Sequence, residues 1–190
     1  MRSFPFILLL LSTLVSLSQE NKSSLHPTYL VKTNLLSFAA SRPTFSLEKV
    51  FTPTISAELS FTQGRFNDFL FTDEYSYSGF LLRMKKYITP FVTETITPYV
   101  GAYTGNLRRT IRTKGRVDPT GWNSIGSRDF SAQSIRAGGT IGVAYLSRQH
   151  FVFDGQTSFG YGRYVHIIRP DTHLNGFADV QIWLSVGYCF

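Results

Sequence analysis

Residues 177–190, which end the chain, read FADVQIWLSVGYCF. The even-numbered positions of this stretch are all apolar, and most of the odd-numbered positions are polar or small. Because successive side chains of a β-strand point to opposite faces, the alternation predicts a strand with one wholly apolar face. The stretch is longer than an average globular strand of about 5–6 residues, and it is long enough to cross a bilayer when tilted.

The composition of the whole chain favours an all-β fold. Aromatic residues make up 15% of the 190 residues, charged residues make up only 16%, and there are 15 glycines. Such a chain is rich in strand formers and poor in the residues that helices use. The mean hydropathy of −0.03 excludes a helical membrane protein but suits a barrel, in which alternation averages the two faces. The length predicts one domain, and the single cysteine, Cys189, leaves no internal disulfide.

Residues 1–18 have the features of a cleaved signal peptide. Arg2 supplies the positive charge, an apolar run begins at Phe6, and small residues lie before the expected cleavage site. We expect the mature chain to start at Gln19. The polar residues 19–28 predict a periplasmic lead-in, which leaves residues 29–190 for the barrel domain.

After the lead-in, the sequence divides into eight strand-like runs. They cover residues 30–38, 43–51, 54–63, 75–87, 95–104, 131–145, 151–163 and 177–190. The connectors after the second, fourth and sixth runs are short, whereas those at 64–74, 105–130 and 165–176 are longer. An even strand number with short turns at one end and long loops at the other is typical of small outer-membrane barrels. In lipid an open sheet edge is not tolerated, so we predict a closed, eight-stranded antiparallel up-and-down transmembrane β-barrel.

Two further features resemble known outer-membrane barrels. The aromatic end at Phe190 resembles the terminal signal by which the barrel-assembly machinery recognises its substrates. The segment Lys32-Thr33-Asn34-Leu35-Leu36 resembles the KTNLL opening of a family of small outer-membrane barrels from Bacteroidota-type bacteria, and Leu47-Glu48 matches the Leu-Glu pair of its second strand. This family has no assigned biochemical role. The resemblance therefore implies a barrel fold and a location in the bacterial outer membrane.

The parity of the runs places eight charged residues on the polar face. They are Lys32, Glu48, Glu58, Arg83, Lys85, Arg136, Asp154 and Asp179. An eight-stranded barrel is just wide enough for side chains to fill its interior, and isolated buried ions are costly. We therefore predict an ion-pair network that plugs the lumen. The functional alternative is an ion or proton path, or acid–base chemistry by the pair Glu48 and Glu58.

The longest connector is strongly basic. It contains Arg108, Arg109, Arg112, Lys114, Arg116 and Arg128 against two acids. Guanidinium groups bind phosphate oxygens in bidentate fashion, so this loop is a candidate site for lipopolysaccharide or another polyanion. The alternative is a solvated basic loop without a ligand. No nucleic-acid motif accompanies the charge, and we expect no nucleic-acid partner.

Two other functions stay open. Some outer-membrane barrels of this size modify lipid A with His, Ser and acidic residues at the outer rim. This chain would place His166, His173, Asp171 and Ser131 at that rim, and Ser127 lies in the basic connector. No catalytic or metal-binding motif accompanies them, so we expect neither an enzyme nor a cofactor. A soluble periplasmic ligand-binding barrel would instead turn its apolar face inward.

Overall fold

The computed structural model describes residues 28–40, 42–69, 72–114, 116–117, 124–125, 128–169 and 175–190. The expected signal peptide and nearly all of the lead-in lie outside these residues. The elements are β1 (Tyr29–Asn34), the 3-10 helix η1 (Leu35–Ala40), β2 (Phe45–Thr52), β3 (Ile55–Phe69), β4 (Thr72–Tyr87), β5 (Ile96–Thr113), β6 (Arg116–Val117), β7 (Ser124–Ile125), β8 (Arg128–Leu146), β9 (Phe151–Arg169) and β10 (Gly176–Cys189). In the described part of the chain, no helix combines the length and apolarity that crossing a membrane requires.

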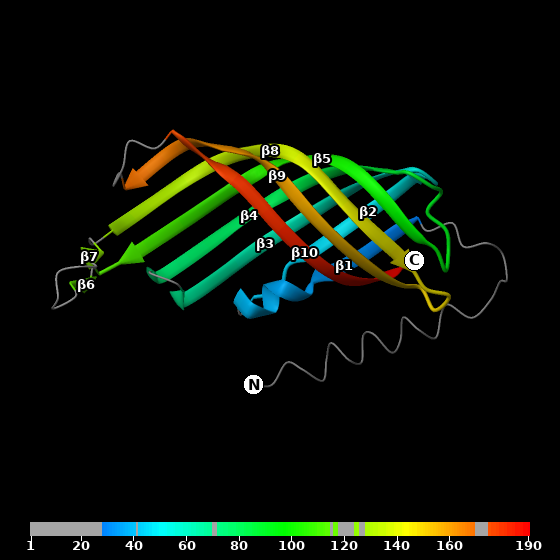
Figure 1. Cartoon of the computed structure of the whole chain (residues 1–190), viewed down its shortest axis with the longest axis horizontal. Coiled ribbons are helices and arrows are strands. Elements are labelled where there is room, and N and C mark those ends of the chain that lie inside the picture. The colour runs from blue at the N-terminus through cyan, green and yellow to red at the C-terminus, as the bar shows by residue number, and fades with distance from the viewer. Residues whose placement is uncertain are drawn as a thin grey trace.

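Eight of the strands form a closed barrel in the order β1-β10-β9-β8-β5-β4-β3-β2, and every neighbouring pair is antiparallel (Figure 1). The ring closes where residues 30–34 of β1 pair with residues 185–189 of β10. The short strands β6 and β7 form a separate hairpin beyond β5 and β8. The predicted eight-stranded antiparallel barrel is therefore confirmed.

Every barrel strand carries exposed apolar side chains on its outer face. One exposed example from each strand is found at Val31, Leu47, Leu59, Leu82, Val100, Ile141, Phe159 and Ile182. Register places the first four of these side by side on consecutive strands, so they form a continuous apolar row. The polar residues of the alternate positions are buried in the lumen. This is the orientation of a transmembrane barrel and the reverse of a soluble ligand-binding barrel.

The end of the barrel that holds both ends of the described chain is sealed. The backbone NH of Phe190 donates to the carbonyl of Tyr29, and the turns between β2 and β3 and between β8 and β9 lie at this end. The connector between β4 and β5 folds across the opening and buries Phe91 against the ring of Tyr87, with ring centroids 4.8 Å apart. An apolar cluster of Leu30, Tyr87, Phe91, Tyr99, Ala144, Leu146, Val152 and Cys189 fills the lumen here.

The long hairpins at the other end contain more strand than the sequence predicted. Residues 64–69, 105–113, 128–130 and 165–169 were expected in connectors but continue β3, β5, β8 and β9. In three of these segments arginine, asparagine and other polar residues interrupt the apolar alternation, so the pattern does not mark them as strand. The exception is the extension of β9, where Val165 and Ile167 are exposed apolar residues that continue the alternation. Antiparallel partners pair there nevertheless, because the two arms of each hairpin stay in register.

The second half of the first run is not a strand, contrary to the prediction. β1 ends at Asn34, whose side-chain oxygen accepts hydrogen bonds from the backbone NH groups of Leu36 and of Leu184 on β10. The hydroxyl of Ser37 then donates to the carbonyl of Asn34 and accepts from the NH of Thr44. These side-chain bonds turn the chain into η1, so β1 and β2 are much shorter than the other strands.

Replacing Ile141 with arginine tests the lipid-facing orientation of the outer surface. The Ile141 side chain is 59% exposed on β8. A charged residue in the lipid-facing band should lower the free energy of unfolding by about 2–4 kcal/mol, measured by urea unfolding in phospholipid vesicles. The control Ile141→Leu should change it by less than about 1.5 kcal/mol. Equal stability of the two variants would contradict a membrane-embedded outer face.

Candidate functional site

The structure brings the eight predicted lumen charges together in two groups. All eight are buried. Six of them, Lys32, Glu48, Glu58, Arg83, Lys85 and Asp154, form one network close to the sealed end of the barrel. The other two, Arg136 and Asp179, pair with each other at 3.4 Å.

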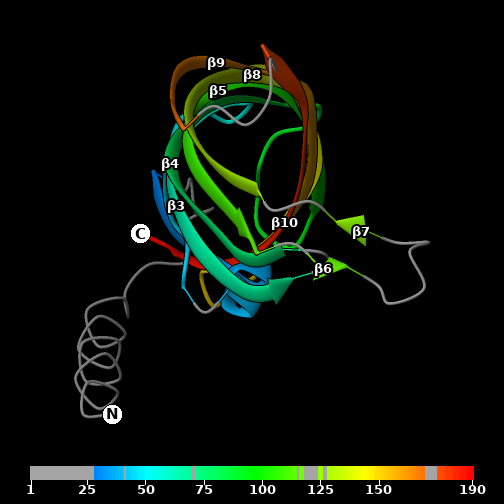
Figure 2. The same cartoon turned by 90° about the vertical axis from the view of Figure 1, so that its left-hand side faces the viewer.

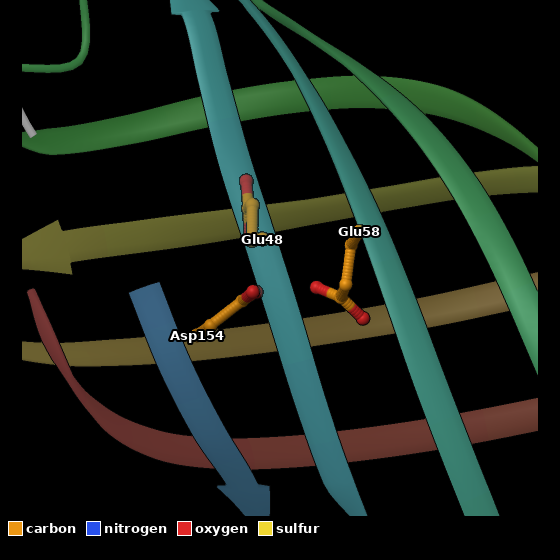
Figure 3. Close-up of side chains that lie close together, drawn as sticks. All are labelled: Glu48, Glu58 and Asp154. Carbon is orange, nitrogen blue, oxygen red and sulfur yellow. The ribbon is translucent and has the colours of Figure 1, made fainter. Parts of the chain in front are cut away.

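Three carboxylates form the centre of the first group. Glu48 and Glu58 lie directly opposite each other on β2 and β3, and Asp154 reaches toward them from β9 (Figure 3). One oxygen atom from each carboxylate lies within 4.8 Å of the corresponding atoms of the other two. Like charges opposite each other on a sheet are destabilising, so this arrangement requires cations in contact with it.

Two ammonium groups lie among these carboxylates. Lys32 Nζ is 2.6 Å from Glu48, 2.5 Å from Glu58 and 2.6 Å from Asp154. Lys85 Nζ contacts the same three groups at 3.1, 2.7 and 2.8 Å. Each ammonium thus uses all three of its protons on carboxylates.

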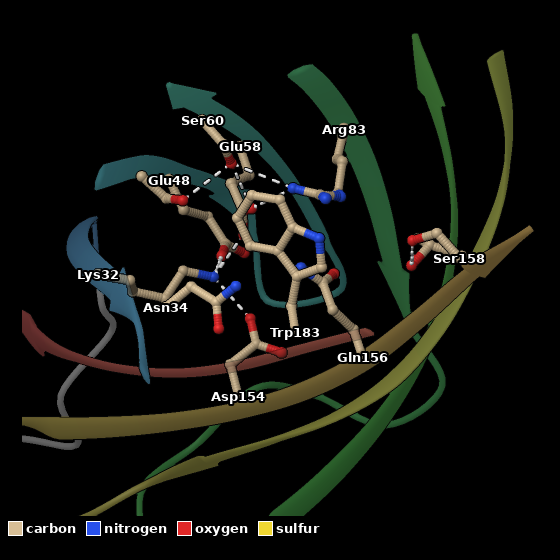
Figure 4. A network of polar contacts seen from close by, with 12 residues as sticks. Lys32, Asn34, Glu48, Glu58, Ser60, Arg83, Asp154, Gln156, Ser158 and Trp183 are labelled. Atoms are coloured by element: carbon tan, nitrogen blue, oxygen red, sulfur yellow. Dashed lines mark hydrogen bonds and ion pairs between the residues drawn. The ribbon is translucent and has the colours of Figure 1, made fainter. Parts of the chain in front are cut away.

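The remaining carboxylate oxygens have neutral or cationic donors. Arg83 Nη1 donates to Glu58 Oε1 at 2.9 Å (Figure 4). The hydroxyls of Tyr87 and Tyr99 donate to Glu48 and Asp154 at 2.7 and 2.5 Å. Three acids and three bases therefore balance, which a buried cluster needs in order to offset the cost of desolvation.

This geometry favours a plug over catalysis or metal binding. A general acid or base needs access to a substrate, whereas both glutamates are at most 1% exposed and the apolar cluster with Phe91 closes the lumen below them. The three carboxylates are a group that a metal ion would suit, but the ammonium groups of Lys32 and Lys85 already occupy the space between them. The same packing opposes an ion path through the barrel.

The second group lies above the first, toward the long hairpins. Asp179 accepts hydrogen bonds from Arg136, from the hydroxyl of Tyr103 at 2.8 Å and from Gln181 at 2.6 Å. Gln181 connects this group to the network below, because its side-chain oxygen accepts a hydrogen bond from Arg83 Nη2 at 3.2 Å. The guanidinium of Arg83 also lies 4.2 Å from the centre of the Trp183 ring (Figure 4). Above Trp183 the lumen widens into a cavity of about 370 Å³.

Sequence reasoning missed the aromatic residues of the lumen. Tyr87, Tyr99, Tyr103 and Trp183 are all buried there. Tyr87 shares its parity with Lys85 and Trp183 shares its parity with Asp179, so the alternation could have found these two. β5, which carries Tyr99 and Tyr103, has no predicted lumen charge to mark its inner face. Tyr75 and Tyr77 of β4 line the cavity above Trp183.

The structure separates the residues of the basic connector. Arg108 and Arg112 are exposed on the outer face of β5, Arg109 lines the cavity, and Lys114 is exposed just after this strand. The side chains of Arg116 and Arg128 lie outside the described part of the structure. β5 continues to Thr113, so the side chains of this segment alternate between the outer face and the lumen. The basic residues that were predicted to share one loop are therefore divided between two faces.

The residues considered for lipid A modification are not assembled in the described part of the chain. Ser131 is buried and its hydroxyl lies 3.1 Å from that of Thr110, whereas His166 is exposed on β9. Ser127, Asp171 and His173 lie outside the described residues.

The fold and lumen define the class of closed, eight-stranded antiparallel barrels with an apolar exterior and a filled polar interior. No protein-family model and no curated protein matches the chain. Among solved structures it is similar to the crystal structure of Neisserial surface protein A (NspA), with a TM-score of 0.53 and 15% sequence identity over 85% of this chain and 93% of that chain. At this identity the similarity supports the fold alone.

Replacing Glu58 with glutamine tests the plug. The substitution removes one of three carboxylates and leaves Lys32, Lys85 and Arg83 with an excess of buried positive charge. We expect the free energy of unfolding to fall by about 3–5 kcal/mol, measured by urea unfolding in vesicles. The control is Glu94→Gln, which removes the exposed ion pair of Glu94 with Arg148 and should cost no more than about 1 kcal/mol. If the two substitutions cost the same, the lumen charges do not form a tightly coupled network.

Proposed function

We propose that the protein is a small β-barrel of the bacterial outer membrane with a structural or surface-interaction role and no transport through its lumen. The observation that supports this most directly is the apolar outer face on all eight strands around a lumen filled by paired charges. Such an exterior needs hydrocarbon around it, and β-barrels of this kind belong to outer membranes. The fold similarity to a neisserial surface protein agrees with this location. The KTNLL-type opening supports our proposal that the chain is one of the small barrels with that motif.

We assign the end with the long hairpins to the cell exterior, because short turns and both termini face the periplasm in such barrels. At this end an outward-facing basic patch lies beyond the apolar face, and it consists of Arg42, Arg65, Arg108 and Arg112. The first three line a groove of about 430 Å³ that crosses β3, β4 and β5.

The charge of this basic patch is only partly compensated. Glu74 accepts from Arg65 at 3.0 Å and lies 3.5 Å from Arg112. Within the described residues, no ion pair involves Arg42 or Arg108. Guanidinium groups just outside a bilayer suit the phosphates of lipopolysaccharide, which carries them at the same height. We propose that the patch contacts lipopolysaccharide or a related surface polyanion.

We propose no enzymatic activity, no cofactor and no nucleic-acid partner for this barrel. Lipid A modification is the second candidate function, since His166 lies at the outer end of β9. Unchanged lipid A in cells that carry His166→Ala and His173→Ala, measured by mass spectrometry, would remove it.

Removing two guanidinium groups of the basic patch tests the polyanion proposal. In Arg42→Ser/Arg108→Ser, two exposed contacts of about 0.5–1 kcal/mol each are lost, so affinity for lipopolysaccharide should fall about tenfold. Binding is measured by titrating lipopolysaccharide into the barrel in nanodiscs. The matched control is Lys49→Ser/Lys86→Ser, which removes two exposed lysines at the opposite end and should leave the affinity unchanged. If the affinity for lipopolysaccharide falls equally in both double variants, or is unchanged in both, the basic patch has no specific role in binding.

The terminal aromatic residue allows a separate test of assembly. We propose that the barrel-assembly machinery recognises the strand that ends at Phe190. In Phe190→Ser the amount of folded barrel in the outer membrane, measured by its heat-dependent gel mobility, should fall several-fold, whereas Phe190→Tyr should assemble normally. Refolding of both variants into detergent should be equally efficient. A parallel failure in detergent would show a folding defect instead of lost recognition.

A further inference from the structure

The barrel wall is incomplete toward the exterior between β3 and β10. β1 pairs with β10 only as far as Ser185, and β2 pairs with β3 only as far as Phe61. Beyond these points residues 176–184 of β10 pair only with β9, and residues 62–69 of β3 pair only with β4. The two strand edges therefore border a lateral gap above the short β1–β2 hairpin.

The helix η1 forms the floor of this gap. It contacts both β10 and β3, and it lies between them when the barrel is viewed from the end that carries β6 and β7 (Figure 2). Asn34, just before η1, covers the first free amide of the β10 edge by accepting from Leu184 NH at 3.2 Å. Above this bond the edge of β10 borders the cavity.

The cavity above Trp183 continues into the gap. Its lining includes every residue of β10 from Phe177 to Trp183, among them Val180 and Ile182, whose side chains point outward. An interior cavity reaches such residues only past a free strand edge. Its volume of about 370 Å³ lies in the range of about 300–1,000 Å³ that is usual for small-molecule sites.

The inner wall of the cavity has an excess of positive charge and unsatisfied donors. Its charged residues are Arg109, Arg136 and Asp179, two guanidinium groups against one carboxylate. Arg136 is only 5% exposed, and its Nε has no hydrogen-bond partner among the described residues. The Nε of Arg109 is likewise without a partner there, while its guanidinium lies 3.9 Å from the centre of the Phe177 ring. A buried donor without a partner is costly, so this wall is suited to an anion that also accepts hydrogen bonds.

The mouth of the cavity is apolar, in contrast to its inner wall. Val180 and Ile182 are 60% and 62% exposed on β10, and Leu36 of η1 is 44% exposed at the floor. These side chains lie on the same outward face as the apolar surface of the barrel, so the mouth opens toward lipid and not only toward water.

We propose that this lateral cavity binds the anionic headgroup of a membrane amphiphile, with its phosphate against Arg109 and Arg136 and its acyl chains leaving between β3 and β10 over η1. A free anion would use the inner wall but would gain nothing from the apolar mouth. A purely apolar ligand would leave the guanidinium groups without partners. The site uses inward-facing arginines and is independent of the outward-facing basic patch proposed above, so either site can fail without the other.

Tryptophan quenching by brominated lipids tests this site. The chain has two tryptophans, and Trp122→Phe leaves Trp183 in the cavity wall as the only one. The full barrel is placed in phosphatidylcholine vesicles that contain a small fraction of lipid with brominated chains, either phosphatidylglycerol or phosphatidylcholine. We expect the anionic lipid to quench Trp183 about fivefold more effectively per mole than the zwitterionic lipid.

The charge variants locate the effect. Arg109→Gln, which breaks no ion pair between described residues, should abolish the preference for the anionic lipid. The matched control Arg163→Gln removes an exposed guanidinium on the outer face of β9 and should retain it. Arg136→Lys keeps the positive charge opposite Asp179 but loses the planar guanidinium, so it should weaken the preference for the anionic lipid. This variant replaces Arg109→Gln as the test if Arg109→Gln fails to fold.

Glycerol phosphate distinguishes a lipid from a free anion. Added at millimolar concentration, it should not reduce the quenching by brominated phosphatidylglycerol. Full displacement by glycerol phosphate, equal quenching by the two brominated lipids, or an unchanged preference in both Arg109→Gln and Arg136→Lys would each overturn the proposal.

Discussion

The contact on which the structure depends is the sharing of two ammonium groups by three carboxylates inside the barrel. Lys32 comes from β1, Lys85 from β4, the two glutamates from β2 and β3, and Asp154 from β9. Hydrogen bonds between neighbouring strands fix the wall, but they connect only neighbours. The charged network connects strands across the lumen, and each of its members would be a costly isolated ion without the others.

The same network explains why the interior is closed although it is polar. In an eight-stranded barrel the side chains of opposite walls meet, so polarity does not imply a water-filled path. Balanced charge removes the need for solvent or counterions, and the apolar cluster around Phe91 keeps water away from one side. Above Trp183, where β1 and β2 have ended, the interior has room for another molecule.

Much of this arrangement could be predicted from the sequence, because each side chain of a barrel strand faces either the lumen or the exterior and the two directions alternate. Once one face is apolar along eight runs, the charges must share the other, and the structure places all eight in the lumen. Alternation did not reveal the extensions of β3, β5 and β8, where polar residues interrupt the apolar face, and the extension of β9 was missed although Val165 and Ile167 continue that face. It also did not reveal η1, since Leu35, Leu36 and Phe38 look like strand residues. The chain turns there through side-chain bonds of Asn34 and Ser37, one of which joins Asn34 to Leu184, 150 residues away. Contacts between distant segments decide such details, and a local pattern does not contain them.

The shortness of β1 also bears on how the ring stays shut. The seam joins residues 30–34 to 185–189, whereas β9 and β10 pair over residues 151–163 and 176–188, so the closing junction has much less backbone pairing to resist separation than the other edge of β10. Lys32 lies within that seam, and its bond to Asp154 reaches past β10 to β9. β10 is thus held in place in two ways. Backbone hydrogen bonds run along both of its edges, and the ion pair between Lys32 and Asp154 joins the two strands on either side of it. In a barrel of this kind, resistance to opening along the seam comes from side chains inside the lumen as well as from the backbone hydrogen bonds of the wall.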